Sequence, residues 1–316
     1  MKVALIAHGG AGSWRPGSEE DAVEGMRAAV ATGRAMLLDR LSALDAVCAT
    51  VVALEDNPIF NAGTGAVLNL DGFCELDASV MESRDRRVGA VSGLQRVRNP
   101  VLVARKVLEE TDHVMLTGEG AQRFARVMGF GDHDPITPAR RADWQDKRNR
   151  VDDVLGKHAL RMRKFLKEHP EYAGGTVGAA AIDSAGVLAA ATSTGGVTLK
   201  MVGRVGDSPI PGAGNYASPW VAASATGTGE FVMRTLSTRA ISDRVERGET
   251  LAAAMQAMLA ELGEAFDADV GFIAVDRQGS TCAQHRTRDM PHAFFEADGE
   301  VVARMRCVVE ERAGRI

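Results

Sequence analysis

The sequence has few cysteines and no long run of positive charge. The four cysteines among its 316 residues lie far apart and form no Cys-x-x-Cys pair. This spacing predicts neither a disulfide framework nor a zinc site and favours a reducing compartment. The net charge is −5, and no lysine or arginine run is long enough to form a nucleic-acid-binding face, so we expect no nucleic-acid partner.

Long apolar runs are missing as well. The first one, residues 3–7, is interrupted by His8-Gly9-Gly10, which makes it too short for a signal-peptide core or a membrane span. No internal repeat or low-complexity tract is present. We therefore expect a cytoplasmic protein without membrane association.

The overall composition is typical of a soluble globular protein with a large core. Hydrophobic residues make up 45% of the chain and charged residues 25%, within the ordinary range for such proteins. The 34 glycines cluster in short motifs. Glycine clusters of this kind indicate close backbone approaches at a site.

The hydrophobic periodicity predicts strands grouped on each side of paired helices. Serine followed three residues later by aspartate, at Ser18 and Ser42, is a helix-capping signature before two amphipathic helices. Strands are predicted at residues 2–8, 75–81, 88–92, 113–117, 187–192, 269–275 and 280–285, and further helices at 100–110, 119–128 and 251–262. This order favours two stacked sheets covered by helical layers over a doubly wound parallel sheet.

The composition changes between Asp132 and Ala173. This segment is rich in Arg, Lys and Asp and is framed by prolines, so we expect a flexible tether. Apolar residues from Val151 to Leu166 recur at helical spacing and predict a helix within it. An ordinary long connection is the alternative.

The most informative stretch is Gly174-Gly175-Thr176-Val177-Gly178, which opens a strand of small residues. We hypothesise that the chain cleaves itself between Gly175 and Thr176. Thr176 would then carry a hydroxyl nucleophile and an α-amine base, and a terminal amine with a pKa of about 7.7–8.0 can accept the hydroxyl proton near neutrality. The alternative is a glycine pair at a bulge before a buried strand.

Further glycine-rich motifs follow in a fixed order. They are Thr-Ser-Thr-Gly-Gly at 192–196, Gly-Arg-Val-Gly-Asp-Ser-Pro at 203–209 and Ala-Thr-Gly-Thr-Gly-Glu at 225–230. With residues 8–12 and 61–65, the set resembles the plant-type L-asparaginase and isoaspartyl peptidase family of N-terminal nucleophile hydrolases. The resemblance covers nearly the whole chain and implies an α+β fold, a four-layer αββα sandwich, with an α-subunit at residues 1–175 and a β-subunit at 176–316. Residues 132–175, the expected flexible tether, would form the C-terminal end of the α-subunit.

The resemblance also implies the catalytic residues. Thr176 matches the nucleophile, with Gly175 before the scissile bond, and Thr194 matches a second threonine whose hydroxyl contacts the nucleophile. Thr226 and Gly227 match the oxyanion-hole pair, the threonine through its side chain and the glycine through its backbone N–H. Taken alone, Thr194 could also be a strand-end hydroxyl bonded to backbone.

Substrate binding is implied on the glycine-rich loop at 203–209. The Arg204 guanidinium suits the α-carboxylate of an aspartyl head group, and Asp207 suits its α-ammonium; a mutual surface salt bridge between the two is the alternative. Gly229 matches a close-approach position in the pocket. Asn61 matches a residue that lines the site from the other half of the chain.

No catalytic cofactor is implied, but the family binds a structural sodium ion through loop carbonyls. The matching positions are Leu54, Glu55, Asn57, Phe60, Ala62 and Thr64. The resemblance further implies an (αβ)2 homodimer of processed chains. The expected substrates are small molecules, namely L-asparagine and β-aspartyl dipeptides, from which L-aspartate is released.

Three alternatives stay open. Glycosylasparaginases share the Arg204 and Asp207 pattern, but usually follow the secretory route and carry aspartate where this chain has Gly175. Taspase-like proteolysis is more distant. A non-catalytic protein that binds a small ligand is a third possibility, although the chain has no phosphate-loop lysine motif.

Overall fold

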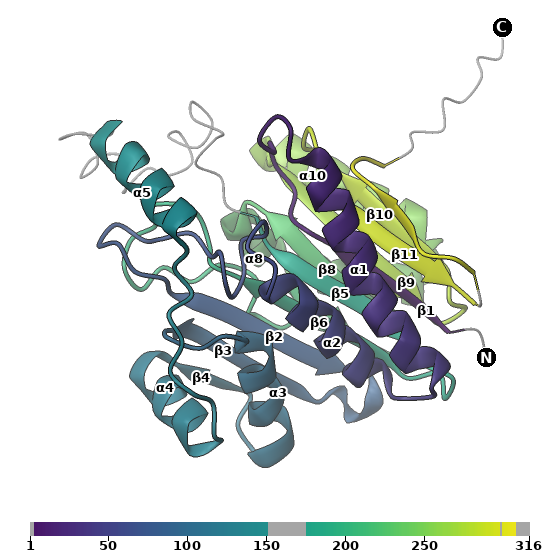
Figure 1. Ribbon diagram of the computed structural model, residues 1–316. Coiled ribbons are helices and arrows are strands. Elements are labelled where there is room, and N and C mark those ends of the chain that lie inside the picture. The colour runs from purple at the N-terminus through teal and green to yellow at the C-terminus, as the bar shows by residue number, and fades with distance from the viewer. Residues whose placement is uncertain (1–2, 151–174, 298, 308–316) are drawn as a thin grey trace, which may run out of the picture.

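The structure is a computed structural model that describes residues 3–150, 175–297 and 299–307. Within these residues the chain forms a mixed arrangement of helices and two β-sheets (Figure 1). The prediction of two sheets in place of one doubly wound sheet is confirmed.

The larger sheet has eight described strands in the order β12-β11-β1-β5-β6-β2-β3-β4. The strands are β1 (Ala4–His8), β2 (Leu76–Glu82), β3 (Val88–Leu94), β4 (Met115–Thr117), β5 (Val177–Ile182), β6 (Leu188–Thr194), β11 (His292–Glu296) and β12 (Val302–Arg304). Neighbouring strands are antiparallel except β3 and β4. The strand that follows Thr176 therefore lies in the middle of the sheet, between β1 and β6.

The smaller sheet has the order β10-β9-β8-β7. Its strands are β7 (Asn215–Ala217), β8 (Val221–Gly227), β9 (Val270–Asp276) and β10 (Thr281–His285). One core cluster joins the two sheets, with Ile6 and Ala180 from the larger sheet and Ala222 and Ile273 from the smaller one. The two sheets consequently pack face to face.

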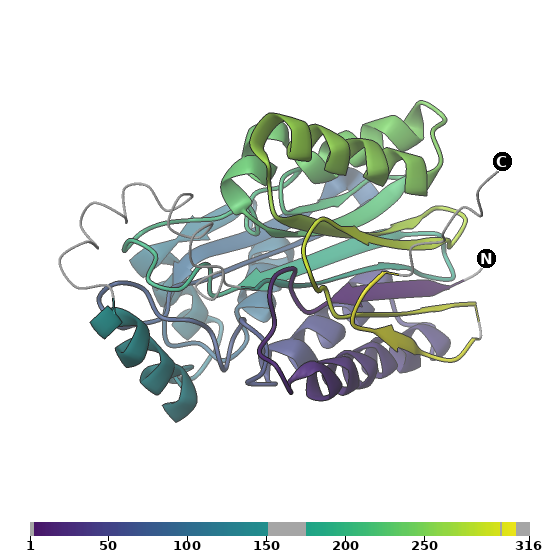
Figure 2. The ribbon, with the colours of Figure 1, turned by 90° about the horizontal axis from the view of Figure 1, so that it is seen from above.

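Helices cover both outer faces. The larger sheet packs against α1 (Glu19–Leu38), α2 (Ala43–Glu55), α3 (Pro100–Glu110) and α4 (Gly118–Val127), whereas the smaller sheet packs against α8 (Gly229–Thr235), α9 (Ser237–Glu246) and α10 (Leu251–Phe266). In Figure 2 the green helices and the purple helix lie on opposite sides of the strands. A short 3-10 helix, η1 (Arg84–Arg86), joins β2 to β3.

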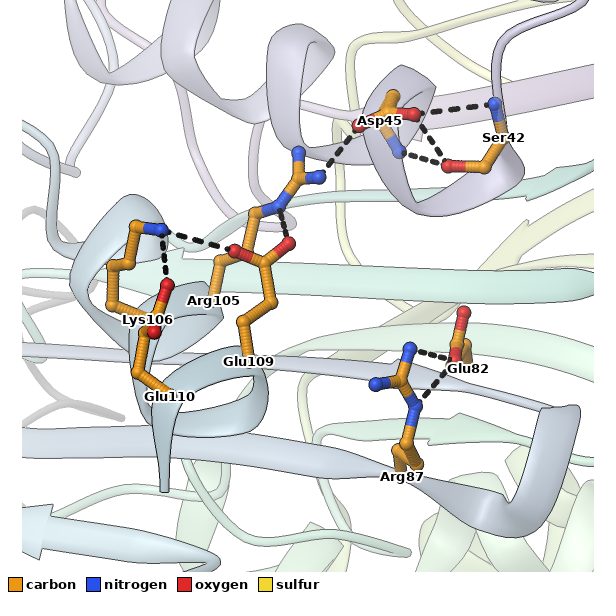
Figure 3. Close-up of polar contacts among 8 residues, drawn as sticks. All are labelled: Ser42, Asp45, Glu82, Arg87, Arg105, Lys106, Glu109 and Glu110. Carbon is orange, nitrogen blue, oxygen red and sulfur yellow. Dashed lines mark hydrogen bonds and ion pairs between the residues drawn. The ribbon is translucent and has the colours of Figure 1, made fainter.

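Local sequence rules account for some helix starts and fail at others. The Ser42 side chain accepts a hydrogen bond from the Asp45 N–H and forms the predicted capping box of α2 (Figure 3). The prediction was wrong at Ser18, whose hydroxyl donates to the carbonyl of Arg15 and does not cap α1. The backbone of Ser18, with φ −99° and ψ 0°, lacks the extended conformation in which an N-cap side chain accepts from the first turn.

The described part of the expected tether, residues 132–150, contains helix α5 (Pro138–Arg150). Three side chains of this helix donate hydrogen bonds to carbonyls of the loop before β2: Arg140 to Gly65, Arg141 to Gly72 and Trp144 to Asn69. These contacts hold α5 against the loop before β2, in the part of the expected tether that the structure describes. The helix predicted from Val151 to Leu166 lies outside the described residues.

Among the helices that the structure describes, none combines the length and the apolar character that a bilayer-spanning segment needs.

Candidate active site

Thr176 lies immediately before β5, at the end where β5 and β6 run side by side. Its side chain is buried, with a relative exposure of 6%. The β5–β6 pairing aligns Val177 with Ser193, which brings Thr176 opposite the last residue of β6, Thr194. The Thr176 hydroxyl donates to the Thr194 hydroxyl across 3.3 Å. The structure therefore brings together the two threonines that the sequence placed 18 residues apart.

Thr194 makes two further contacts. Its oxygen accepts a hydrogen bond from the Gly196 N–H at 2.9 Å, and its hydroxyl donates to the carbonyl oxygen of Gly175 at 3.0 Å. These contacts fix the direction of the hydroxyl proton toward the bond that joins Gly175 to Thr176.

Asn61 contacts the same carbonyl from the other half of the chain. Its side-chain nitrogen donates to Gly175 O at 2.6 Å and to Gly196 O at 2.7 Å. The Gly175 carbonyl thus receives two side-chain donors, which is the arrangement that stabilises an oxyanion on a carbonyl under attack. The sequence indicated only that Asn61 lines the site, and this contact was not predicted.

The turn at His8–Gly12 passes directly beside the Gly175–Thr176 bond. A Cβ atom on Gly10 would lie 2.9 Å from the Cα of Gly175, and the φ angle of Gly10 is +114°. Only glycine combines this backbone conformation with this approach. The predicted close approach at this turn is confirmed.

Thr226 and Gly227 end strand β8 on the facing sheet. The Thr226 hydroxyl oxygen is fully buried and accepts a hydrogen bond from the Ala11 N–H at 3.0 Å. Gly227 has a φ angle of +119°, and a Cβ there would lie 2.2 Å from Asp269 O. Thr226 is thus tied to the turn that borders Gly175 and Gly227 packs against Asp269, although no hydrogen bond among the described residues joins either of them to Thr176.

Arg204 and Asp207 lie on one loop but do not form a salt bridge with each other. The Arg204 guanidinium pairs with Glu230 at 2.9 Å, a partner that sequence reasoning missed. Asp207 is buried, and its Oδ2 has no hydrogen-bond partner. Burial raises the pKa of Asp207 to about 7, although the charge of Arg204 opposes that shift. A buried carboxylate oxygen without a donor suits an incoming ammonium group.

Gly229 keeps space beside this pair of charges. A Cβ on Gly229 would lie 2.5 Å from Asp207 Oδ1 and 3.3 Å from Arg204 Nη2. Any larger residue would therefore fill the volume next to both groups.

A family model described as Asparaginase matches residues 1–303. This chain belongs to the asparaginase family. The "Plant-type L-asparaginase" of Pyrococcus abyssi (strain GE5 / Orsay) is 46% identical over 296 residues, which cover 93% of this chain and 96% of that protein. The "Isoaspartyl peptidase/L-asparaginase" of Homo sapiens is 38% identical over 303 residues, which cover 95% of each. The protein of the same name from Danio rerio is 39% identical over 301 residues, 93% of this chain and 92% of that protein.

This asparaginase-family chain also contains a buried polar network that was not predicted. His8 Nε2 lies 2.9 Å from the Ser224 hydroxyl, which lies 2.8 Å from the Thr192 hydroxyl. Burial lowers the pKa of His8 to about 3, so the imidazole is neutral at physiological pH. The network joins β1, β6 and β8, and so links the two sheets.

The loop that was expected to bind sodium is compact. The Thr64 N–H donates to Glu55 O at 2.8 Å and closes it, and the Phe60 N–H donates to Asn57 O at 3.2 Å. Neutral carbonyl oxygens such as those of Leu54, Glu55, Asn57, Phe60, Ala62 and Thr64 are suitable ligands for a hard monovalent cation. Phe60 O also accepts a hydrogen bond from Arg140 Nη2 at 3.3 Å. Within the described residues, no group of three or more His, Cys, Asp or Glu side chains could hold a metal ion.

A cavity of about 420 Å³ adjoins Gly175. Its lining includes Gly10, Trp14, Arg140 and Lys147. Neither Arg204 nor Asp207 lines it, so this cavity and the charged loop lie in different parts of the site.

Proposed function

We propose that this chain is a self-processing amidohydrolase that hydrolyses β-aspartyl dipeptides and the side-chain amide of L-asparagine, releasing L-aspartate. One observation carries the proposal: the Gly175 carbonyl accepts hydrogen bonds from Asn61 and Thr194, while the Thr176 hydroxyl lies against Thr194. The relatives named isoaspartyl peptidase and L-asparaginase support the choice of substrates.

Self-processing begins when the Thr176 oxygen attacks the carbonyl carbon of Gly175. The negative charge that develops on the carbonyl oxygen is stabilised by Asn61 and Thr194. The carbon–nitrogen bond then breaks, and the hydroxyl proton ends on the released nitrogen. Water hydrolyses the resulting ester, which leaves a carboxylate on Gly175 and a free α-amine on Thr176.

The free amine is the base in the mature enzyme. It takes the proton of the Thr176 hydroxyl as this oxygen attacks the side-chain carbonyl of the substrate. The Thr226 hydroxyl and the Gly227 N–H stabilise the oxyanion. The amine of the leaving group departs with a proton, and water hydrolyses the aspartyl ester on Thr176 to L-aspartate.

The substrate's charged head group binds at the loop that carries Arg204 and Asp207. Arg204 takes the α-carboxylate, which then shares the guanidinium with Glu230, and Asp207 takes the α-ammonium. The absence of a side chain at Gly229 provides room for both interactions.

We also propose that the two face-to-face sheets and their helices are the four-layer αββα sandwich of N-terminal nucleophile hydrolases. The subunits are residues 1–175 and 176–316, and they assemble as an (αβ)2 homodimer with sodium bound at the carbonyls of residues 54–64. All four cysteines are free thiols, which supports a cytoplasmic location.

The test compares the wild-type chain with Thr176→Ala and with Thr32→Ala, a control on the exposed face of α1. Denaturing electrophoresis and intact mass should give fragments 1–175 and 176–316 for the wild type and for Thr32→Ala, and an intact chain for Thr176→Ala. Only the cleaved proteins should hydrolyse a β-aspartyl dipeptide and L-asparagine. A wild-type chain that stays whole and is fully active would refute self-processing, and a preference for glycosylated asparagine would favour a glycosylasparaginase.

A further inference from the structure

Strand β2 and the residue just before it carry three polar side chains at alternate positions. Glu75 precedes the first residue of β2, and Asp77 and Ser79 follow within it. All three are buried, with relative exposures of 4%, 0% and 1%. Because side chains alternate along a strand, these residues point to the same face. Burying three polar groups in a row is costly unless each has a partner.

Each of them contacts the loop that carries the charged pair of the site. Glu75 Oε1 accepts a hydrogen bond from the Gly203 N–H at 2.9 Å, and Asp77 Oδ2 accepts one from the Gly206 N–H at 3.5 Å. The Ser79 hydroxyl donates to Ser208 O at 2.5 Å. Three alternate positions, one just before β2 and two within it, therefore hold the start, the middle and the end of residues 203–208.

A buried lysine supplies the counter-charge. Lys200 has a relative exposure of 0%, and its ammonium donates to Glu75 O at 2.8 Å. Burial lowers the pKa of Lys200 and raises the pKa of Asp77, and in each case the charge of the other residue opposes the shift. The second Asp77 oxygen accepts a hydrogen bond from the Gly93 N–H at 2.9 Å, so both of its carboxylate oxygens are engaged.

The charged pair lies between these attachment points. Arg204 directly follows Gly203, which is bonded to Glu75. Asp207 lies between Gly206, which is bonded to Asp77, and Ser208, which is bonded to Ser79. The carbonyl of Asp207 also accepts hydrogen bonds from Gly214 and Ile210. The backbone that carries both charges is therefore fixed from β2 on one side and by its own turn on the other.

We propose that Glu75, Asp77 and Ser79, with Lys200 as their counter-charge, are positioning residues that set the distance between Arg204 and Asp207 and thereby the affinity for the aspartyl head group. They touch no substrate and act through the loop alone. This inference rests on the proposed function of that loop. It adds the residues that make the loop selective for a ligand with a carboxylate and an ammonium on one carbon.

The experiment compares Asp77→Asn and Ser79→Ala with a control on the same strand. Asn at position 77 has the same shape but one acceptor fewer, so the N–H of either Gly93 or Gly206 loses its partner. Ser79→Ala removes one hydrogen bond without changing a charge next to Lys200, and it keeps the test valid if Asp77→Asn does not fold. The control is Glu82→Gln, because Glu82 lies at the far end of β2, where it pairs with Arg87 (Figure 3).

The measurements are KM and kcat for a β-aspartyl dipeptide, the Kd for L-aspartate from titration calorimetry, and the melting temperature. We expect KM and Kd to rise about tenfold for Asp77→Asn and about threefold or more for Ser79→Ala, with kcat changed much less. Glu82→Gln should lower the melting temperature and leave KM and Kd unchanged.

Two results would refute the positioning role. The first is a wild-type Kd and KM in folded Asp77→Asn and Ser79→Ala. The second is an equal loss of affinity in Glu82→Gln, which would point to general stability. A wild-type protein that neither hydrolyses the dipeptide nor binds L-aspartate would refute the proposed function, and this inference with it.

Discussion

The side-chain nitrogen of Asn61 lies 2.6 Å from the carbonyl oxygen of Gly175, although 114 residues separate them in the chain. The orientation of this amide is set by its other contacts, since the same nitrogen donates to Gly196 O and the Asn61 oxygen accepts from the Val67 N–H. The donor is therefore held in place before any charge develops on the carbonyl. Such preorganisation is what makes an oxyanion donor effective.

We expect Asn61→Asp to slow self-processing about 10²–10³-fold, because it removes this donor and places a negative group beside the developing oxyanion. A carboxylate oxygen at this position can still accept the hydrogen bond from the Val67 N–H, which limits the structural change. Asn99→Ala, at the start of α3, is the control. The measurement is the fraction of cleaved chain over time after purification, followed by denaturing electrophoresis. Equal rates for Asn61→Asp and Asn99→Ala would contradict the role of Asn61.

Thr194 should be needed for its hydroxyl and not for its shape. Thr194→Val removes the group that accepts from Thr176 and donates to Gly175 O, and we expect processing to slow by about 10²–10⁴-fold. Thr194→Ser keeps the hydroxyl and should stay within about tenfold of the wild type. The processing rate, and kcat normalised to the cleaved fraction, distinguish the two variants. A normally active valine variant would exclude a role in proton transfer.

The KM for L-asparagine should rise as the pH falls below neutrality. Asp207 has its pKa raised to about 7 by burial, so below that pH it is protonated and cannot balance the substrate ammonium. We expect KM to increase by up to about tenfold for each pH unit. KM is the informative quantity, because kcat also reflects the Thr176 amine. A KM that does not change between about pH 5.5 and 8 would contradict this assignment.

The raised pKa of Asp207 also predicts how the stability of the folded state depends on pH. A carboxyl group whose pKa rises from 3.8 to about 7 on folding stabilises the folded state fully below pH 3.8, and this contribution is lost as the pH rises to about 7. Asp207→Asn should therefore raise the melting temperature above neutrality while it abolishes substrate affinity. Thermal unfolding of both proteins at acidic and alkaline pH is the measurement. An equal difference in melting temperature between the two proteins at both pH values would contradict this prediction.

Gly178 should tolerate no side chain. A Cβ there would lie 2.0 Å from the Ser224 hydroxyl and 2.7 Å from His8 Nε2, so we expect Gly178→Ala to lower the free energy of unfolding by about 1–3 kcal/mol. Gly120→Ala is the matched control, because no atom lies within 4 Å of a Cβ at this position of α4, and it should stabilise by about 0.5–1 kcal/mol. Urea unfolding measures both. A stable Gly178→Ala protein would show that the sheets can separate locally.

Sequence patterns were sufficient where the determining contacts are local. The bounds of α3 agree with the predicted helix at residues 100–110, and the amphipathic helix predicted after Ser18 is α1, whose buried residues recur at helical spacing from Ala22 to Leu37. Helical periodicity and capping are properties of neighbouring residues, so one sequence reveals them. The docking of α5 was not predicted, because it depends on carbonyls of a loop about 70 residues away.

The residues of the candidate site were also predicted only in part. The short motifs indicated Thr176, Thr194 and Arg204, because a glycine lies next to each of these residues in the sequence. Glu230 as the partner of Arg204 and Asp77 beneath the loop were missed. A lone carboxylate has no local signature, and only the three-dimensional structure brings it to its partner.

The order of strands in the larger sheet determines how the two fragments would be held together if the chain is cleaved as proposed. Strand β1 precedes the proposed cleavage site, yet it lies between β11 and β5, which follow that site, and β6 in turn borders β2. The two polypeptides would be interlaced through backbone ladders on both sides of β1 and again between β6 and β2. They could not dissociate or be exchanged with those of another molecule without unfolding the whole sheet, so each active centre would keep the two polypeptides from which it was made.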